Sequence, residues 1–313
     1  MSGCDTAERR MLVVFPGALG DLMLAMPAIA AIARQNRGVS IELMARGELA
    51  RLAQGHSVVA RGHSIDRREV TALFHESGSE GSASREFFGR FGRIYSFFAF
   101  DDARFRAALA SSTDGTVSFH RFRPVGEGHI AAAYLRDIEE SDEFLDATNL
   151  LEPSQEDIAE AKAALESAGC DASKTIAIFP GSGSQKKNWP AENFVQLARK
   201  LSGEIDARAV VVLGPAEENL SEIFHEAGLP AIENAELGTV AAIAKIAACF
   251  VGNDSGVSHL AATAGARGVV LFGPTDPARW RPLGCVEIIR GEPIESIAVN
   301  EVEAAVMRTC AVA

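Results

Sequence analysis

Short apolar runs alternate along the chain with turns and with stretches whose apolar positions recur at helical spacing. In the first half, this pattern predicts its clearest helices over Leu22–Gln35 and Ala103–Ala110. The strands expected around them are Met11–Phe15, Val39–Met44, Ser57–Ala60, Ile94–Phe98 and Thr116–Phe119. Strands that alternate with helices form βαβ units, so we expect an α/β fold built on a parallel sheet.

Near Leu150 the first series of strands and helices ends and a second one begins. Ser154 is followed three residues later by Asp157, a pattern typical of a helix start. A second series of strands is expected at Lys174–Phe179, Ala209–Leu213, Cys249–Val251, Gly268–Phe272 and Val286–Ile289. We therefore predict two Rossmann-like doubly wound domains, residues 1–152 and 153–313. In such sheets, ligands bind beyond the carboxyl ends of the strands, where the strand order reverses.

One stretch interrupts the alternation in the first half. Residues Ser77–Ser84 read SGSEGSAS and are rich in glycine and serine. This composition favours a mobile loop over a regular element.

Composition narrows the class of protein. A chain of 313 residues that is 47% hydrophobic can bury the cores of two domains. The formal net charge of −12 gives no general attraction to nucleic acid, so we expect no nucleic-acid partner. The five cysteines show no C-x-x-C spacing. A reducing cytoplasm therefore fits better than a disulfide framework or a zinc site.

The chain also lacks the usual signals for a membrane or for export. No apolar run reaches about 18 residues, so we expect no membrane-spanning helix. The opening MSGCDTAERR has no apolar core, so we expect no signal peptide. Peripheral contact with a membrane stays open.

The first candidate motif is FPGALGDLMLAMPA, which follows the first predicted strand. Gly17, Gly20 and Asp21 form G-x-x-G-D, not the G-x-G-x-x-G of dinucleotide-binding turns. Glycines still let a ligand approach the backbone closely. Asp21 falls in the first helical turn, where it could simply stabilise the helix. Its charge would repel a phosphate but suits a base that accepts a proton from a hydroxyl.

The second motif is IAIFPGSGSQKKNWPAENF. Backbone N–H groups of a loop containing Ser182 and Gly183 can cradle phosphate oxygens, and Lys187 can add a positive charge. The spacing differs from that of a P-loop. The alternative is a solvent-exposed turn before a helix that starts at Pro190.

The third motif is ACFVGNDSGVSHLAATAG. A buried strand runs into Asp254, Ser255 and Gly256, and a small-residue helix with His259 in its first turn follows. The N–H groups at such a helix start can bind an anion, and His259 can donate to a phosphate. Alternatively, Asp254 caps the helix and His259 is a buried structural histidine.

Two further sets of residues are weaker candidates. An acid beyond a strand of such a sheet can bind ribose hydroxyls, and Glu217 or Glu218 follows the strand VVVLG. Arginine suits bidentate binding of phosphate or carboxylate, and the first half contains arginines but no lysine. Its candidates for an anionic acceptor are Arg121, Arg123, Arg61, Arg67 and Arg68. Motifs such as H-E-x-x-H are absent, so a tightly held catalytic metal is not expected.

Taken together, these motifs resemble glycosyltransferase family 9, the ADP-heptose:lipopolysaccharide heptosyltransferases. The resemblance rests on GALGD with Pro27-Ala28, on PGSG with KNWP, and on NDSGVSHLA with FGPTDP, in this order from residue 11 to about 284. It implies a GT-B architecture with the active site in the interdomain cleft. It also implies inverting transfer of heptose from an ADP-sugar to the lipopolysaccharide core, without a metal or a separate cofactor.

Carried over residue by residue, the resemblance makes Asp21 the base. It assigns Ser182, Gly183 and Lys187 to a phosphate loop, and it makes Asp254, Ser255, Gly256 and His259 the donor-binding turn. Glu217 or Glu218 would take the ribose role. The N-terminal domain then binds the acceptor, with Gly17, Gly20, Arg121 and Arg123 as candidates. A membrane-anchored lipopolysaccharide precursor or similar glycan would be the acceptor, for an enzyme in the cytoplasm that contacts the inner membrane.

The middle of the first half, about residues 55–150, contains no motif that matches the family, so the acceptor and the sugar stay open. A glycosyltransferase with another nucleotide-sugar donor is one alternative, and a non-catalytic nucleotide- or sugar-binding protein is another. An epimerase-like or NAD-dependent enzyme on similar domains is a third, although the missing G-x-G-x-x-G argues against NAD. The oligomeric state is not predicted.

Overall fold

In a computed structural model of the chain, two compact units are formed by Met1–Leu145 and Asp146–Ala313. The structure describes residues 10–75, 80–141, 145, 149–204 and 207–311. The division between the two units falls a few residues before residue 152, the boundary that the sequence suggested.

The first unit contains a parallel sheet of five strands in the order β3-β2-β1-β4-β5. The strands are β1 Arg10–Val14, β2 Ser40–Ala45, β3 Arg61–Ser64, β4 Arg93–Ser96 and β5 Thr116–Phe119. The described helices are α1 Leu19–Gln35, α2 Gly47–His56, α3 Arg68–Thr71, α4 Glu80–Phe88, α5 Ala103–Ser111 and α6 Ile130–Asp137. The strand order reverses between β1 and β4, next to the turn that follows β1.

The second unit contains a parallel sheet of six strands in the order β11-β10-β9-β6-β7-β8. These are β6 Thr175–Phe179, β7 Arg208–Leu213, β8 Ala231–Glu233, β9 Cys249–Asn253, β10 Gly268–Phe272 and β11 Val286–Arg290. The described helices are α7 Gln155–Ser167, α8 Ala191–Glu204, α9 Glu218–Glu226, α10 Leu237–Ile246, α11 Gly256–Thr263, α12 Pro277–Trp280 and α13 Val299–Ala311. The order reverses between β6 and β9, so the loops after these two strands meet at the switch point.

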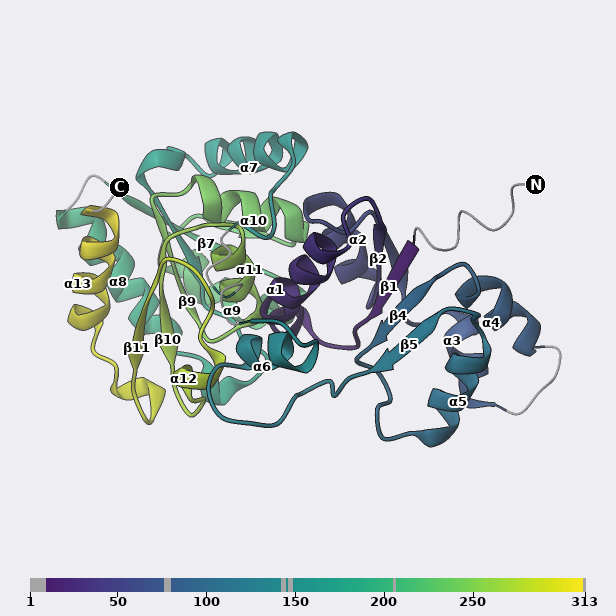
Figure 1. The fold of residues 1–313 in the computed structure, drawn as a ribbon. Helices are drawn as coiled ribbons and strands as arrows, with labels where there is room; N and C mark the ends of the chain where they lie inside the picture. The colour runs from purple at the N-terminus through teal and green to yellow at the C-terminus, as the bar shows by residue number, and fades with distance from the viewer. Residues whose placement is uncertain (1–9, 76–79, 142–144, 146–148, 205–206, 312–313) are drawn as a thin grey trace. The chain divides into compact units, whose positions relative to one another are not determined.

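Helices cover both faces of the second sheet, as expected for buried parallel strands. Ile176 and Ile178 of β6 pack into a cluster with α8 and α13, whereas Ala177 and Phe179 pack with α7 and α10 (Figure 1). Successive side chains of this strand point to opposite faces of the sheet, so they pack into two separate cores. This confirms the prediction of doubly wound, Rossmann-like domains.

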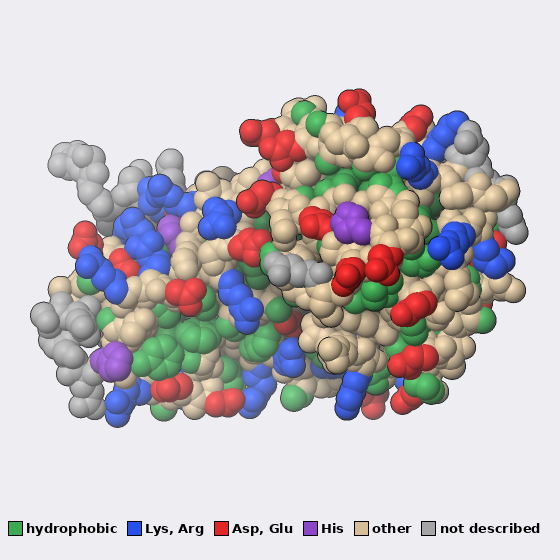
Figure 2. All heavy atoms as spheres, turned by 180° about the vertical axis from the view of Figure 1, so that it is seen from behind, with side chains coloured by type: hydrophobic (Ala, Val, Ile, Leu, Met, Phe, Trp, Pro, Cys, Tyr) green, Lys and Arg blue, Asp and Glu red, His purple; other side chains and the backbone are tan. Residues whose placement is uncertain are grey.

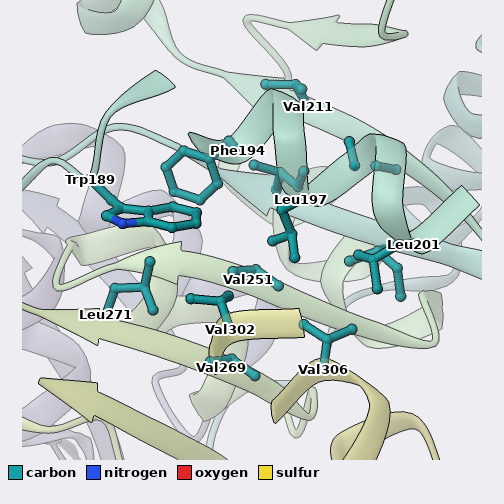
Figure 3. Packing of buried hydrophobic residues seen from close by; sticks show 14 of the residues in the cluster. Trp189, Phe194, Leu197, Leu201, Val211, Val251, Val269, Leu271, Val302 and Val306 are labelled. Carbon is teal, nitrogen blue, oxygen red and sulfur yellow. The ribbon is translucent and has the colours of Figure 1, made fainter. Parts of the chain in front are cut away.

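Figure 3 shows the first of these cores. Trp189 lies against Phe194 with ring centroids 4.9 Å apart, and Val302 of α13 packs in the same cluster. The indole N–H of Trp189 donates to the carbonyl of Ile297 at 3.0 Å. The loop after β6 therefore ends on a fully buried and fully bonded anchor, which holds the residues just before Trp189 in place.

The prediction for the third strand was wrong. The strand is Arg61–Ser64, not Ser57–Ala60. The Ser57 hydroxyl bonds back to Ala53 at the end of α2, so the apolar residues after it serve as a connector. The sequence of this strand is polar, and its buried residue is His63. The His63 side chain pairs with Glu42 of β2, with 2.6 Å between Nε2 and Oε2. A paired polar side chain can occupy a core position that apolar patterning would not find.

The Gly/Ser-rich stretch is helical in the part that the structure describes. Residues 77–79 lie outside the described residues, but α4 begins at Glu80, so a loop over the remainder of the stretch was a wrong prediction. Ser84 is buried in this helix, and its hydroxyl donates to the carbonyl of Glu69 at 2.8 Å. The short strand β8 was not predicted. The predicted helix start at Ser154 is confirmed, since Ser154 is the N-cap of α7.

Among the described residues, no helix has the length and apolar character needed to span a membrane.

Candidate functional site

In the second unit, one buried side chain fixes the two loops at the switch point. Asn253, the last residue of β9, is completely buried. Its Nδ2 donates to the carbonyl of Pro180 at 2.7 Å, and its Oδ1 accepts from the backbone N–H of Trp189 at 3.1 Å. Both ends of the loop after β6 are therefore tied to β9, and the loop between them has a defined position over the strand ends.

The ionisable residues of the second and third motifs meet at this point. Lys187 Nζ is 2.7 Å from Asp254 Oδ2, and His259 Nε2 is 3.8 Å from Asp254 Oδ1. Burial raises the pKa of Asp254, but hydrogen bonds from His259, Lys187 and Thr275 and the charge of Lys187 together hold that pKa below its usual value. The carboxylate of Asp254 therefore positions two potential phosphate ligands at once.

Exposure differs sharply across this cluster. The side chains of Asp254 and His259 are each 6% exposed, whereas that of Lys187 is 32% exposed. The ammonium group of Lys187 thus contacts Asp254, while part of the Lys187 side chain reaches solvent. A charged donor that reaches solvent can bind an external anion without losing its internal partner.

The start of helix α11 lies directly beside the cluster. Ser255 is its N-cap, and the Ser255 hydroxyl accepts from the backbone N–H of Ser258 at 3.4 Å. The Ser258 hydroxyl in turn donates to the carbonyl of Asn253 at 2.7 Å. Gly256 is the first helical residue, so the N–H groups of the first turn have no partner inside the helix. Asp254 precedes the cap and so is not the helix cap that the alternative interpretation assumed.

The glycine-serine loop is shaped by its own hydroxyl. Ser182 Oγ lies 2.5 Å from Asn188 Oδ1 and 2.8 Å from the carbonyl of Ser184. Gly183 has no atom within 4 Å of the position that a Cβ would occupy. The loop is thus held by Ser182 while its backbone at Gly183 faces open space, as a phosphate-binding loop requires.

Glu217 joins this set from the end of β7. Its Oε2 accepts from the backbone N–H of Gly214 at 2.9 Å. A Cβ on Gly181 would lie 2.1 Å from Glu217 Oε1, so the carboxylate packs directly against the start of the β6 loop. The structure therefore brings Glu217 to the same edge as Lys187. The side chain of Glu218 lies outside the described residues.

In the first unit, Asp21 lies in the first turn of α1. Its Oδ2 accepts from the backbone N–H of Ala18 at 3.2 Å, and its Oδ1 is 3.5 Å from Arg123 Nη2. The carboxylate therefore stabilises the helix start and also contacts an arginine. The side chain is 13% exposed, so Asp21 is held firmly and still reaches solvent.

Aromatic packing holds the turn that carries Asp21. A Cβ on Gly17 would lie 2.5 Å from Phe15 and 2.9 Å from Phe122, so only glycine fits there. Phe15 also packs edge-on against Tyr134, whose hydroxyl donates to the carbonyl of Phe122 at 2.7 Å. Gly20 lies one residue before Asp21 in the helix and is partly exposed.

A hollow of about 530 Å³ adjoins this turn. Its lining is aromatic and charged, and includes Pro16, Phe97, Phe100, Asp101, Arg121 and Arg123. The guanidinium of Arg121 lies 4.5 Å from the centre of the Phe100 ring and 3.5 Å from Asp101. Arg123 both lines the hollow and contacts Asp21. Nothing in the sequence patterns predicted the aromatic residues of this wall.

A second hollow of the first unit, of about 500 Å³, is rich in arginine. Arg61, Arg67, Arg68 and Arg90 line it together with Glu69 and Glu86. Arg67 and Arg90 each lie over the Phe87 ring, at 4.5 and 4.7 Å from its centre. On the face drawn in Figure 2, basic side chains gather over the part that the first unit forms. Three of the arginines singled out in the sequence thus share one hollow.

The described residues contain no group of three or more His, Cys, Asp or Glu side chains that could hold a metal ion. The sequence motifs also missed the structural part played by Asn253. Its only signal was its position, at the end of a buried strand and beside Asp254.

The fold is shared with solved glycosyltransferases of GT-B architecture. A family 9 glycosyltransferase from Veillonella parvula superposes with a TM-score of 0.80 at 18% identity, covering 97% of this chain and 98% of that one. E. coli ADP-heptose lipopolysaccharide heptosyltransferase II gives 0.76, covering 97% and 99%, again at 18% identity. E. coli heptosyltransferase WaaC with ADP gives 0.70, covering 96% and 99%, also at 18%. These likenesses establish the GT-B fold, two Rossmann-like domains.

No curated protein matches the chain by sequence. The model of glycosyltransferase family 9 (heptosyltransferase) matches residues 128–303. That range is more than half of the chain and contains the whole Lys187, Asp254 and His259 cluster. The chain therefore belongs to glycosyltransferase family 9, the heptosyltransferase family, and is a glycosyltransferase.

Proposed function

We propose that this glycosyltransferase moves a heptose-like sugar from an ADP-sugar to a lipopolysaccharide core or related glycan, with inversion and without a metal or separate cofactor. The observation that carries the proposal is the cluster in which Asp254 holds Lys187 and His259 beside the start of α11. The solved relative WaaC contains ADP, which supports an adenine nucleotide as the donor of this chain too.

On the donor side, the diphosphate would lie between the loop after β6 and the start of α11. Lys187 supplies a positive charge, and His259 and the backbone N–H groups of Gly256 and Val257 supply hydrogen bonds. These groups stabilise the charge that grows on the leaving diphosphate. Asp254 does not contact the anion itself in this proposal, because its carboxylate faces Lys187 and His259.

Glu217 would bind the ribose through a hydrogen bond from a ribose hydroxyl. Gly214 holds Oε2, and this leaves Oε1 as an acceptor for a hydroxyl. The absence of a side chain at Gly181 leaves the room that the Glu217 carboxylate needs to lie at this edge.

On the acceptor side, Asp21 would remove the proton of the attacking hydroxyl. General-base catalysis of this kind contributes about 10²–10⁴-fold to the rate. Its helix position and its contact with Arg123 fix the carboxylate, which is the geometric requirement for a base. The adjoining hollow, with its aromatic wall and with Arg121 and Arg123, would bind the acceptor sugar.

An anionic acceptor agrees with the two arginine-lined hollows of the first unit. A membrane-anchored lipopolysaccharide precursor has this chemistry. The proposed location is therefore the cytoplasm with peripheral contact at the inner membrane.

The test is a transfer assay with ADP-heptose and a deacylated core acceptor, combined with thermal shifts in ADP, UDP, GDP and NAD. We expect product formation and selective stabilisation by ADP. Stabilisation by UDP or GDP alone would replace the donor and keep the reaction class. Stabilisation by a nucleotide without transfer or donor hydrolysis would favour the non-catalytic binding protein.

A further inference from the structure

Two cysteines of the second unit meet where the last helix packs on the sheet. Cys249 begins β9 and is fully buried, and Cys310 lies in the last turn of α13 and is partly exposed. Their Sγ atoms are 3.6 Å apart. Both side chains belong to the core between α13 and the sheet, with α8 beside them (Figure 1).

We propose that Cys249 and Cys310 form an oxidation site in which a peroxide joins the two thiols in a reversible disulfide. The site is separate from the proposed transfer chemistry, because Cys249 stands at the opposite end of β9 from Asn253 and the donor turn. It stands independently of the donor and acceptor assigned above.

The geometry favours this bond. A disulfide needs its sulfurs about 2.0 Å apart, so the two Sγ atoms must approach by roughly 1.6 Å. Cys310 is in the final turn of its helix, where the last carbonyls have no helical partner and the turn is least constrained. A rotation of its side chain can supply this movement while Cys249 stays in the central strand.

The two thiols differ in reactivity, and this sets the order of events. The neighbouring Cys249 thiol lowers the pKa of Cys310 to about 7. The hydrogen bond with Cys310 and burial raise the pKa of Cys249 well above its usual value. Cys310 is therefore the thiolate that meets the oxidant, because the thiolate is the nucleophilic form and its side chain is the more accessible.

The reaction proceeds in two balanced steps. The Cys310 thiolate attacks hydrogen peroxide, an S–O bond forms, the O–O bond breaks, and hydroxide leaves and is protonated to water. Cys249 then attacks the sulfenic sulfur, the S–S bond forms, and the hydroxyl leaves with the Cys249 proton as a second water. The two thiols lose two electrons to the peroxide, and a dithiol reductant reverses the change.

The bond would close a loop of 61 residues and tie α13 to β9. A cross-link of this kind restricts the unfolded chain and so stabilises the folded one. We expect a higher Tm for the oxidised protein and an unchanged affinity for ADP.

The experiment treats the native full-length protein with hydrogen peroxide, alkylates it under denaturing conditions and maps its peptides by mass spectrometry. We expect a linked peptide pair that contains Cys249 and Cys310, with two fewer alkylated thiols, both restored by dithiothreitol. Cys310→Ser and Cys249→Ala should each abolish the link. Cys285→Ser should keep it, because Cys285 is exposed and outside the pair.

Three results would overturn the proposal. One is a Cys249 thiol that stays alkylatable while Cys310 is oxidised to the sulfinic acid. Another is a disulfide that joins other cysteines or two chains. The third is a link that survives in Cys310→Ser, a variant of a partly exposed position whose folding is checked by circular dichroism.

Discussion

Asp21 is the residue on which the proposed chemistry depends most. Asp21→Asn keeps the size of the side chain and an oxygen that can accept from Ala18, but it removes the basic carboxylate. We expect kcat to fall by about 10²–10⁴-fold with little change in donor affinity. Initial rates at saturating acceptor, with the donor Kd measured separately, give both quantities. A normal kcat with weakened donor binding would mean that Asp21 is not the base.

Arg121 and Arg123 offer a matched comparison at the same scale. Both line the hollow beside Asp21, but only Arg123 contacts the Asp21 carboxylate. Arg121→Ala should therefore raise the acceptor KM, by about tenfold for the loss of one charge-assisted hydrogen bond. Arg123→Ala should raise KM and also lower kcat.

Steady-state kinetics with varied acceptor separates the two effects. Identical behaviour of the two variants would show that the contact between Arg123 and Asp21 has no part in turnover. An unchanged acceptor KM in both would remove this hollow from the acceptor site.

At the scale of elements, the turn between β1 and α1 works because Gly17 has no side chain. Gly17→Ala places a methyl 2.5 Å from Phe15 and 2.8 Å from Asp21 Cβ. We expect unfolding free energy to fall by about 1–3 kcal/mol through overpacking, and kcat to fall because α1 and Asp21 shift. Urea unfolding and initial rates measure the two changes.

Gly55→Ala is the control for this prediction. Gly55 lies in α2 of the same unit, and a Cβ there meets no atom within 4 Å. Alanine has a higher helix propensity than glycine, so this substitution in the last turn of α2 should be neutral or stabilising. Equal behaviour of the two alanine variants would contradict the packing explanation.

The sequence pattern predicted most of the strands but not all of the elements. Apolar runs predicted β1, β2, β4, β6, β7, β9 and β10 because these strands are buried on both faces. The pattern failed at β3, where His63 is buried by pairing with Glu42, and at α4, where a helix starts inside a glycine-serine stretch. Such outcomes depend on partners from elsewhere in the chain.

For the candidate site, the sequence identified the chemistry better than its arrangement. The residue types around Lys187, Asp254 and His259 pointed to an anion site. Their spacing could not show that the carboxylate faces both Lys187 and His259, since 67 residues separate Lys187 from Asp254. The aromatic wall around Phe97 and Phe100 gave no signal, because buried aromatic residues look alike in sequence whether they line a hollow or a core.

For the whole molecule, two buried carboxylates predict sensitivity to acid, one in each unit. Burial raises the pKa of Glu42, but His63, Arg10 and Arg90 outweigh it, and the pKa is lowered; that of Asp254 is lowered too. A lowered folded-state pKa stabilises the fold above the unfolded values of about 4, and the contribution is lost as pH falls below them.

The unfolding free energy should therefore decline as pH falls from about 5 to about 3. Glu42→Gln should be less stable near neutral pH, since it loses the carboxylate that bonds to His63, and its stability should decline less steeply in acid. Urea unfolding at a series of pH values gives both curves. Parallel curves for the two proteins would contradict a role for this carboxylate in acid sensitivity.

The central claim is that the nucleotide diphosphate binds in the second unit at Lys187, whereas the base, Asp21, belongs to the first unit. Calorimetric titration of ADP tests it most directly. We predict that the unaltered protein binds ADP, that Lys187→Ala weakens the Kd by about 10–100-fold through the loss of one charge-assisted contact, and that Asp21→Asn leaves the Kd unchanged. Equal ADP affinity in the Lys187→Ala variant, or a loss of affinity in Asp21→Asn instead, would contradict the account.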